Sequence, residues 1–162
     1  MRCPVVVVFL AWAIGACSAA HHNAQPPTTA TAAASTPTSA SARCATPTRF
    51  GLGGATNEIR GASRDATVWG LALGPGHLPP RAGEELKIVW RMTGAGPLRV
   101  AFVAPDGSAR ALAFGPERHT VSTFHRPGDE WGTGFRFDMA GCWHIHLART
   151  DTSGDIWFDV AA

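Results

Sequence analysis

The pattern best suited to chemistry is a pair of histidines, His144 and His146, which are separated by Ile145. On a β-strand, residues i and i+2 point to the same face, so the two imidazoles are able to bind one metal ion. Copper or zinc suits this ligand pair, and a third ligand is needed to complete such a site. The candidates for that ligand are His119, His125, Met139, Asp138 and Asp129. The alternative is that both histidines are ordinary polar side chains on the solvent-facing side of a strand.

A second candidate site lies between His125 and Gly132, a segment rich in turn-forming residues that also contains Trp131. Arg126, Asp129 and Glu130 place charges of both signs beside this tryptophan. A tryptophan in a polar loop is often the anchor of a binding site, because indole offers a large contact area with few torsions to fix. The alternative is a structural role, in which Trp131 is a cap folded over the open end of the domain.

The sequence contains none of the motifs that commonly mark a catalytic site. It has no Gly-x-Ser-x-Gly, no His-Glu-x-x-His and no phosphate-binding glycine loop. The acidic pairs Glu84–Glu85 and Asp129–Glu130 are adjacent, so on a strand their carboxylates point in opposite directions. We therefore expect no catalytic residues and no enzyme activity. A net charge of +2 without a run of Lys or Arg also argues against a nucleic-acid partner.

The elements that must position these residues are short strands, because apolar and polar residues alternate over short segments. The clearest segment is 84–93, where Leu86, Ile88, Trp90 and Met92 share one face. The other expected strands cover residues 66–73, 98–104, 109–114, 120–124, 134–138, 143–148 and 156–160. Gly, Pro and Asp turns separate these strands. Residues 44–162 are therefore expected to form an all-β domain, an antiparallel β-sandwich.

The segment from Asp138 to Trp143 resembles a corner of immunoglobulin-like sandwiches. In that corner an aromatic residue follows an Asp-x-x-Gly turn and packs beneath it. Here Asp138 and Gly141 are the turn residues, and Trp143 stands where that fold usually has Tyr. The resemblance implies an immunoglobulin-like antiparallel β-sandwich, and it implies no particular activity.

Residues 1–16 have the features of a lipoprotein signal peptide: a positive Arg2, an apolar run, and Ile14-Gly15-Ala16 directly before Cys17. This ending resembles the bacterial lipobox. The resemblance implies that the peptide is cut before Cys17 and that the Cys17 thiol carries a lipid. The exported protein would then be anchored to the outer face of the bacterial cell membrane. The alternatives are ordinary secretion, with cleavage after Ser18-Ala19-Ala20, and an uncleaved anchor.

Residues 17–43 consist of the lipidated cysteine followed mainly by Ala, Thr, Ser and Pro. This composition has no apolar periodicity and nothing to bury, so it predicts a disordered tether. The pair His21-His22 lies in this segment and is expected to be solvated, although it offers a loose metal-binding alternative.

The four cysteines divide into two pairs with different expected roles. Cys3 leaves with the signal peptide and Cys17 carries the lipid. The remaining Cys44 and Cys142 are an even pair in an oxidising compartment, which predicts a disulfide between them. The alternative, a reactive or metal-binding Cys142, leaves Cys44 without a role.

Residues 126–137 and 141–147 resemble the C-terminal half of uncharacterised exported lipoproteins of high-G+C bacteria. The shared features are an early Cys, a Gly-Phe segment, and a Gly-Cys-Trp run that opens a late strand. Where those proteins commonly continue with Glu, this chain has His144. The resemblance implies a lipoprotein with a β-sandwich domain and contributes no mechanism. Because catalytic motifs are lacking, we expect the protein to be a non-catalytic binding or scaffolding module at the cell envelope. Its expected partners are the membrane, through the anchor, and an unidentified protein or small ligand.

Overall fold

A computed structural model of the chain describes residues 42–51, 57–74 and 76–162. These residues form eight strands in two antiparallel sheets, which confirms the all-β antiparallel sandwich; the immunoglobulin-like assignment stays a prediction. The predicted signal peptide, Cys17 and the tether up to residue 41 lie outside the described residues. Among the described residues there is no helix that is long and apolar enough to span a membrane.

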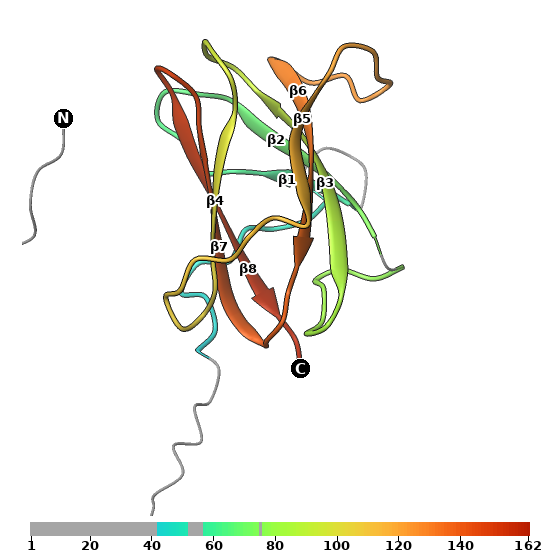
Figure 1. Cartoon of the computed structure of the whole chain (residues 1–162), viewed down its shortest axis with the longest axis vertical. Coiled ribbons are helices and arrows are strands. Elements are labelled where there is room, and N and C mark those ends of the chain that lie inside the picture. Colours follow the sequence, from blue (N-terminus) through green and yellow to red (C-terminus); the bar gives the residue numbers. More distant parts are fainter. Residues whose placement is uncertain (1–41, 52–56, 75) are drawn as a thin grey trace, which may run out of the picture. The chain divides into compact units, whose positions relative to one another are not determined.

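The larger sheet has five strands in the order β1-β2-β3-β6-β5, and the smaller sheet has three in the order β4-β7-β8. The larger sheet consists of β1 (Glu58–Arg60), β2 (Val68–Leu73), β3 (Glu85–Met92), β6 (Asp129–Arg136) and β5 (Phe114–His119). The smaller sheet consists of β4 (Arg99–Val103), β7 (Gly141–Ala148) and β8 (Ser153–Val160). Figure 1 shows β4, β7 and β8 running side by side and facing the strands of the larger sheet.

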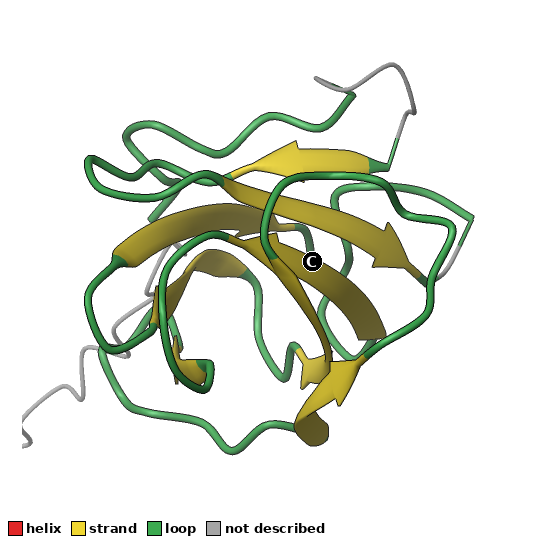
Figure 2. Cartoon of the chain, turned by 90° about the horizontal axis from the view of Figure 1, so that it is seen from above, coloured by secondary structure: helices red, strands yellow, loops and turns green. Residues whose placement is uncertain are grey.

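Aromatic side chains fill the space between the two sheets, which the strands enclose in the view of Figure 2. Phe102 of β4 lies 4.6 Å from the ring of Trp143 and 5.0 Å from the ring of Phe135, measured between ring centroids. Trp90 is fully buried, and its indole nitrogen donates a 2.8 Å hydrogen bond to Thr133 Oγ1 of β6. The buried indole therefore has a partner for its polar atom, which makes its burial inexpensive.

The alternation predicted for residues 84–93 is confirmed in β3. Leu86, Ile88, Trp90 and Met92 are at most 1% exposed. Lys87, between them, points to the opposite, outer face of the sheet and lies over the Phe114 ring.

Four predicted strands in the second half of the chain are wrong in position or extent, and one of them, expected at 156–160, begins earlier, at Ser153. The strand expected at 109–114 begins only at Phe114, and of the earlier residues Ala109 makes an isolated bridge to Val103. The strand expected at 120–124 is a loop. The strand expected at 134–138 begins earlier, at Asp129, and ends at Arg136. The short strand β1 was not predicted.

The glycines of β6 explain why its first half was predicted to be a loop. A Cβ atom on Gly132 would lie 2.9 Å from the ring of His119, and one on Gly134 would lie 2.3 Å from the ring of Phe114. Both rings belong to β5, the neighbouring strand. The glycines therefore allow β5 side chains to lie directly over β6, a use of glycine that sequence patterns do not distinguish from a turn.

The predicted disulfide between Cys44 and Cys142 is present, with 4.8 Å between the Cα atoms. It joins the beginning of the described domain to the first residues of β7. The nearby Trp143 is fully buried, and its indole nitrogen donates to the carbonyl oxygen of Met139 at 2.9 Å. The aromatic residue after the Asp138–Gly141 corner therefore packs beneath it, as expected from the sequence.

The free edge of β8 is covered by segments from the first part of the domain. The backbone of Thr48 donates to the Trp157 carbonyl at 2.8 Å, and the Ala62 and Asp155 backbones exchange hydrogen bonds of 2.8 and 2.9 Å. Phe50 also stacks on Phe158, with 5.3 Å between ring centroids. β8 is therefore hydrogen-bonded along both edges, to β7 and to the segments that contain Thr48 and Ala62. This fixes the backbone from which its solvent-facing side chains project.

We expect Trp90→Ala to lower the free energy of unfolding by about 3–5 kcal/mol, because it truncates a fully buried aromatic side chain. The matched control is Trp157→Ala, which removes a tryptophan that is 38% exposed and should cost less than about 1 kcal/mol. Urea denaturation followed by circular dichroism measures both changes. Equal losses in the two variants would contradict the assignment of Trp90 to the core.

Candidate metal-binding site

The two histidines of the sequence motif lie on the outer face of β7, the central strand of the smaller sheet. Their neighbours Trp143, Ile145 and Leu147 are all fully buried. Because successive strand residues point to opposite faces, burial of these three side chains turns His144 and His146 toward solvent. The prediction that the two imidazoles share one face is confirmed.

The third member of the group is Asp155, which comes from the adjacent strand β8. In the register of the β7–β8 pair, Asp155 lies directly opposite His146 and Trp157 lies directly opposite His144. Directly opposed residues have Cβ atoms close enough for their side chains to meet. Both His146 and its neighbour on the same face, His144, therefore reach Asp155.

One carboxylate oxygen of Asp155 contacts both imidazoles. His144 Nε2 lies 2.7 Å from Asp155 Oδ1, and His146 Nδ1 lies 2.8 Å from the same oxygen. The three ligand atoms all lie within 4.8 Å of one another. The side chains are 24%, 39% and 38% exposed for His144, His146 and Asp155, so an ion can reach them from solvent.

The orientation of His144 is fixed by Trp157. The two rings stack with 3.8 Å between their centroids and an interplanar angle of 5°. A stacked ring loses much of its freedom to rotate, so its Nε2 atom stays directed at Asp155. The backbone of Asp155 is in turn held by its hydrogen bonds to Ala62.

The surroundings of Asp155 lower the pKa of its carboxyl below the usual 3.8. Partial burial acts in the opposite direction and raises this pKa, because it disfavours the charged form. The hydrogen bonds from His146 and His144, together with the positive charge that these rings carry when protonated, outweigh that effect. Asp155 therefore offers an ionised oxygen ligand at neutral pH.

The third ligands predicted from the sequence are in other parts of the fold. His119 lies in β5 of the larger sheet, where its Nδ1 is 3.1 Å from Glu130 Oε1. Asp138 pairs with Arg110 at 2.9 Å, and Met139 packs against the core. His125 lies in the loop before β6. These side chains lie apart from the histidine pair, and the register of β7 and β8 instead places Asp155 opposite His146.

The predicted binding anchor around Trp131 is also wrong. Trp131 and Glu130 belong to β6 and are each only 3% exposed, so they have almost no surface to offer a partner. Glu130 instead pairs with Arg91, with 2.9 Å between Oε2 and Nε. Arg126, from the same predicted site, pairs with Glu58 at 2.6 Å and lies over the Trp69 ring.

Trp131 is structural, but it belongs to strand β6 and the core and does not form the loop cap of the predicted alternative. It contacts Arg149, a residue that the sequence analysis did not single out. The guanidinium of Arg149 lies 4.5 Å from the Trp131 ring, and its side chain is 3% exposed. Arg149 donates to the carbonyl oxygens of Met92 and Gly96 and to Asp129 Oδ2, the last at 2.6 Å. Asp129, predicted as a binding residue, therefore serves as the partner of a buried cation.

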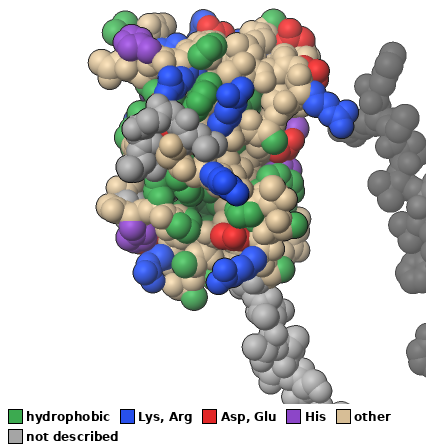
Figure 3. All heavy atoms as spheres, turned by 180° about the vertical axis from the view of Figure 1, so that it is seen from behind, with side chains coloured by type: hydrophobic (Ala, Val, Ile, Leu, Met, Phe, Trp, Pro, Cys, Tyr) green, Lys and Arg blue, Asp and Glu red, His purple; other side chains and the backbone are tan. Residues whose placement is uncertain are grey.

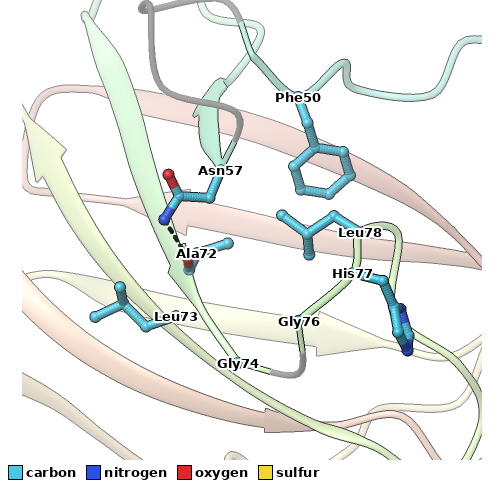
Figure 4. A pocket seen from close by; sticks show the side chains of 8 residues that line it. All are labelled: Phe50, Asn57, Ala72, Leu73, Gly74, Gly76, His77 and Leu78. Atoms are coloured by element: carbon cyan, nitrogen blue, oxygen red, sulfur yellow. Dashed lines mark hydrogen bonds between the residues drawn. The ribbon is translucent and has the colours of Figure 1, made fainter.

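Two surface hollows differ in the polar groups that they offer. The larger, about 550 Å³, lies beside β2, and its polar groups are already engaged: Asn57 donates to the Ala72 carbonyl (Figure 4), and His77 pairs with Glu84. The other hollow, about 360 Å³, is bordered by Asp155 of the candidate site. The face in Figure 3 shows basic side chains separated by hydrophobic and neutral ones, without a continuous basic surface there.

Comparison of the chain with protein-family models, with curated proteins and with solved structures found no match. The resemblance to exported lipoproteins therefore stays a prediction.

We expect the pKa of Asp155 to lie below 3.8 and to rise toward that value in His146→Ala, which removes one of its hydrogen bonds. A lowered pKa in the folded state stabilises the protein above about pH 4, and this stabilisation is lost as the pH falls through the folded pKa. The variant should therefore lose less stability on acidification than the wild type. NMR titration of the side-chain carboxyl measures the pKa, and His119→Ala, on the other sheet, is the control. A pKa of Asp155 at or above 3.8 in the wild type would contradict this account.

Proposed function

We propose that this protein is an exported, lipid-anchored domain that binds a transition metal ion, Zn(II) or Cu(II), at the outer face of the bacterial cell membrane. The observation that carries the proposal is the convergence of His144, His146 and Asp155 on one exposed point. In this proposal the domain binds and presents the ion, and it is not an enzyme.

The chemistry of the three side chains supports zinc or copper. Imidazole suits both metals, and two histidines with one carboxylate form a ligand set that zinc commonly uses. Ligand bonds of about 2.0–2.2 Å in a tetrahedral site place ligand atoms roughly 3.3 Å apart. The present distances of 2.7 and 2.8 Å from Asp155 to the imidazoles would thus have to lengthen slightly, which side chains on a surface can accommodate.

The lipobox-like sequence before Cys17 and the disulfide support the proposed location. Disulfides persist in oxidising compartments and are rare in the cytosol, so the Cys44–Cys142 bridge agrees with export. The composition of residues 17–43 suits a tether between the lipidated cysteine and the domain.

A second candidate function is a binding or scaffolding module at the cell envelope that uses no metal. The hydrogen bonds between Asp155 and the two histidines favour it, because they already give each of these polar side chains a partner. Its partner would be an unidentified protein or small ligand. Calorimetric titration with Zn(II) and Cu(II) separates the two candidates.

We expect the full chain, purified in detergent without a histidine tag, to bind Zn(II) or Cu(II) with a dissociation constant of about 1 μM or lower, which corresponds to roughly 8 kcal/mol. The double variant His144→Ala/His146→Ala should bind at least about tenfold more weakly, because it removes two of three ligands. Isothermal titration calorimetry measures both affinities, and circular dichroism verifies that each variant is folded.

Two controls test the location of the site. The variant His119→Ala changes a histidine of the other sheet, and His21→Ala/His22→Ala removes the histidine pair of the predicted tether. Both should bind as the wild type does. Loss of binding in the tether variant, or unchanged binding in His144→Ala/His146→Ala, would refute the proposed site.

Export with lipid anchoring makes a separate prediction for Cys17→Ser. Without the thiol no lipid can be attached, so the protein should move from the membrane fraction to the medium or accumulate as an unprocessed precursor. Immunoblotting of fractionated cells measures this change, and Cys3→Ser is the matched control. Membrane association and processing identical to the wild type would contradict lipidation at Cys17.

A further inference from the structure

The three donors of the candidate site lie on one side of the ion that they would hold. All of them project from the outer face of the β7–β8 pair, so the sheet lies beneath the ion. In the part of the chain that the structure describes, no fourth His, Cys, Asp or Glu joins this group. Zinc takes four ligands, and a site with three protein ligands keeps a position for water or an external ligand.

The charge of the loaded site favours an anion at that position. A divalent ion with two neutral imidazoles and one carboxylate retains a net charge of +1. Bound metal ions are often the largest local charges in a site, so this excess attracts a ligand with one negative charge.

The hollow of about 360 Å³ beside Asp155 provides a second group for such a ligand. It is lined by Ser63, Arg64, Asp65 and Ser153 in addition to Asp155 and Ala62. Its floor is fixed, because the Ser63 hydroxyl donates to the Ser153 carbonyl at 2.6 Å. Arg64 is exposed and forms no ion pair with any residue that the structure describes.

The two charged side chains of the hollow narrow the choice of ligand. The planar guanidinium of Arg64 matches the geometry of a carboxylate or a phosphate. Asp65 lines the same hollow and repels negative charge, which disfavours a dianion such as phosphate more strongly than a monoanion. A carboxylate with a single negative charge satisfies both conditions.

We infer that the metal-loaded protein binds a small monocarboxylate, with one oxygen on the ion at His144, His146 and Asp155 and the other facing Arg64. This inference rests on the proposed function, because it requires the ion. It identifies the ligand class of the envelope domain as a carboxylate that the ion and one arginine hold together.

The test uses the full chain loaded with Co(II), whose visible absorption reports changes in its ligands, and acetate as the probe. Addition of acetate should change the absorption in a saturable manner. Arg64→Ala should weaken the apparent acetate affinity roughly two- to fivefold, the effect expected for one exposed ion pair. The matched control Arg136→Ala removes an arginine on the other sheet, whose side chain is 66% exposed, and should leave the acetate affinity unchanged.

The outcomes separate this inference from the proposed function. If none of Zn(II), Cu(II) and Co(II) binds at the histidine pair, the proposed function fails. If Co(II) binds but acetate leaves its absorption unchanged, the inference is overturned and the metal site stands. An acetate affinity that Arg64→Ala does not alter, or a phosphate affinity equal to that of acetate, also overturns the inference.

Discussion

The pairing of β7 with β8 above an aromatic core is the constraint on which the rest of the structure depends. On each strand one face is fully buried, through Trp143 and Ile145 on β7 and through Ile156 on β8. A slip of either strand by one residue would bury its polar residues and expose its apolar ones, which is prohibitively unfavourable. The same requirement that fills the core therefore brings His144, His146 and Asp155 together on the outer face, without any separate device to position them.

A buried arginine maintains this register at the turn between the two strands. Arg149 lies directly after β7, and its guanidinium connects that turn to Met92 at the end of β3, to Gly96 of the β3–β4 loop and to Asp129 of β6. A buried cation is costly unless its donors are satisfied, and here Met92, Gly96 and Asp129 accept from it. The turn that leads into β8 is thus fixed to both sheets, which keeps Asp155 opposite His146 rather than one residue away.

The sequence predicted the features that depend on the local alternation of apolar and polar residues and on the number of cysteines. The inward face of β3, the common face of His144 and His146, and the pairing of Cys44 with Cys142 belong to this class. It did not predict Asp155 as the third ligand, because the expected last strand began at Ile156 and because register is a property of two strands. It misplaced the start of β6 because Gly132 and Gly134 resemble turn residues, although their role is to admit the β5 rings. Because these glycines made the segment look like a loop, the sequence did not show that Trp131 lies in a strand and packs into the core.

The architecture also bears on whether an ion at this site would be a structural metal or a bound ligand. Small domains that need a structural metal have too little core to fold without it, whereas here two sheets enclose a continuous core and a disulfide closes the chain. The donors stand on the middle strand of a sheet and its neighbour, with the β8 edge covered and the His144 ring stacked on Trp157, so they are arranged before an ion arrives. Donors that are arranged in advance lower the ordering cost of binding, and their exposure leaves a bound ion open to an external ligand, which agrees with a role in binding and presentation.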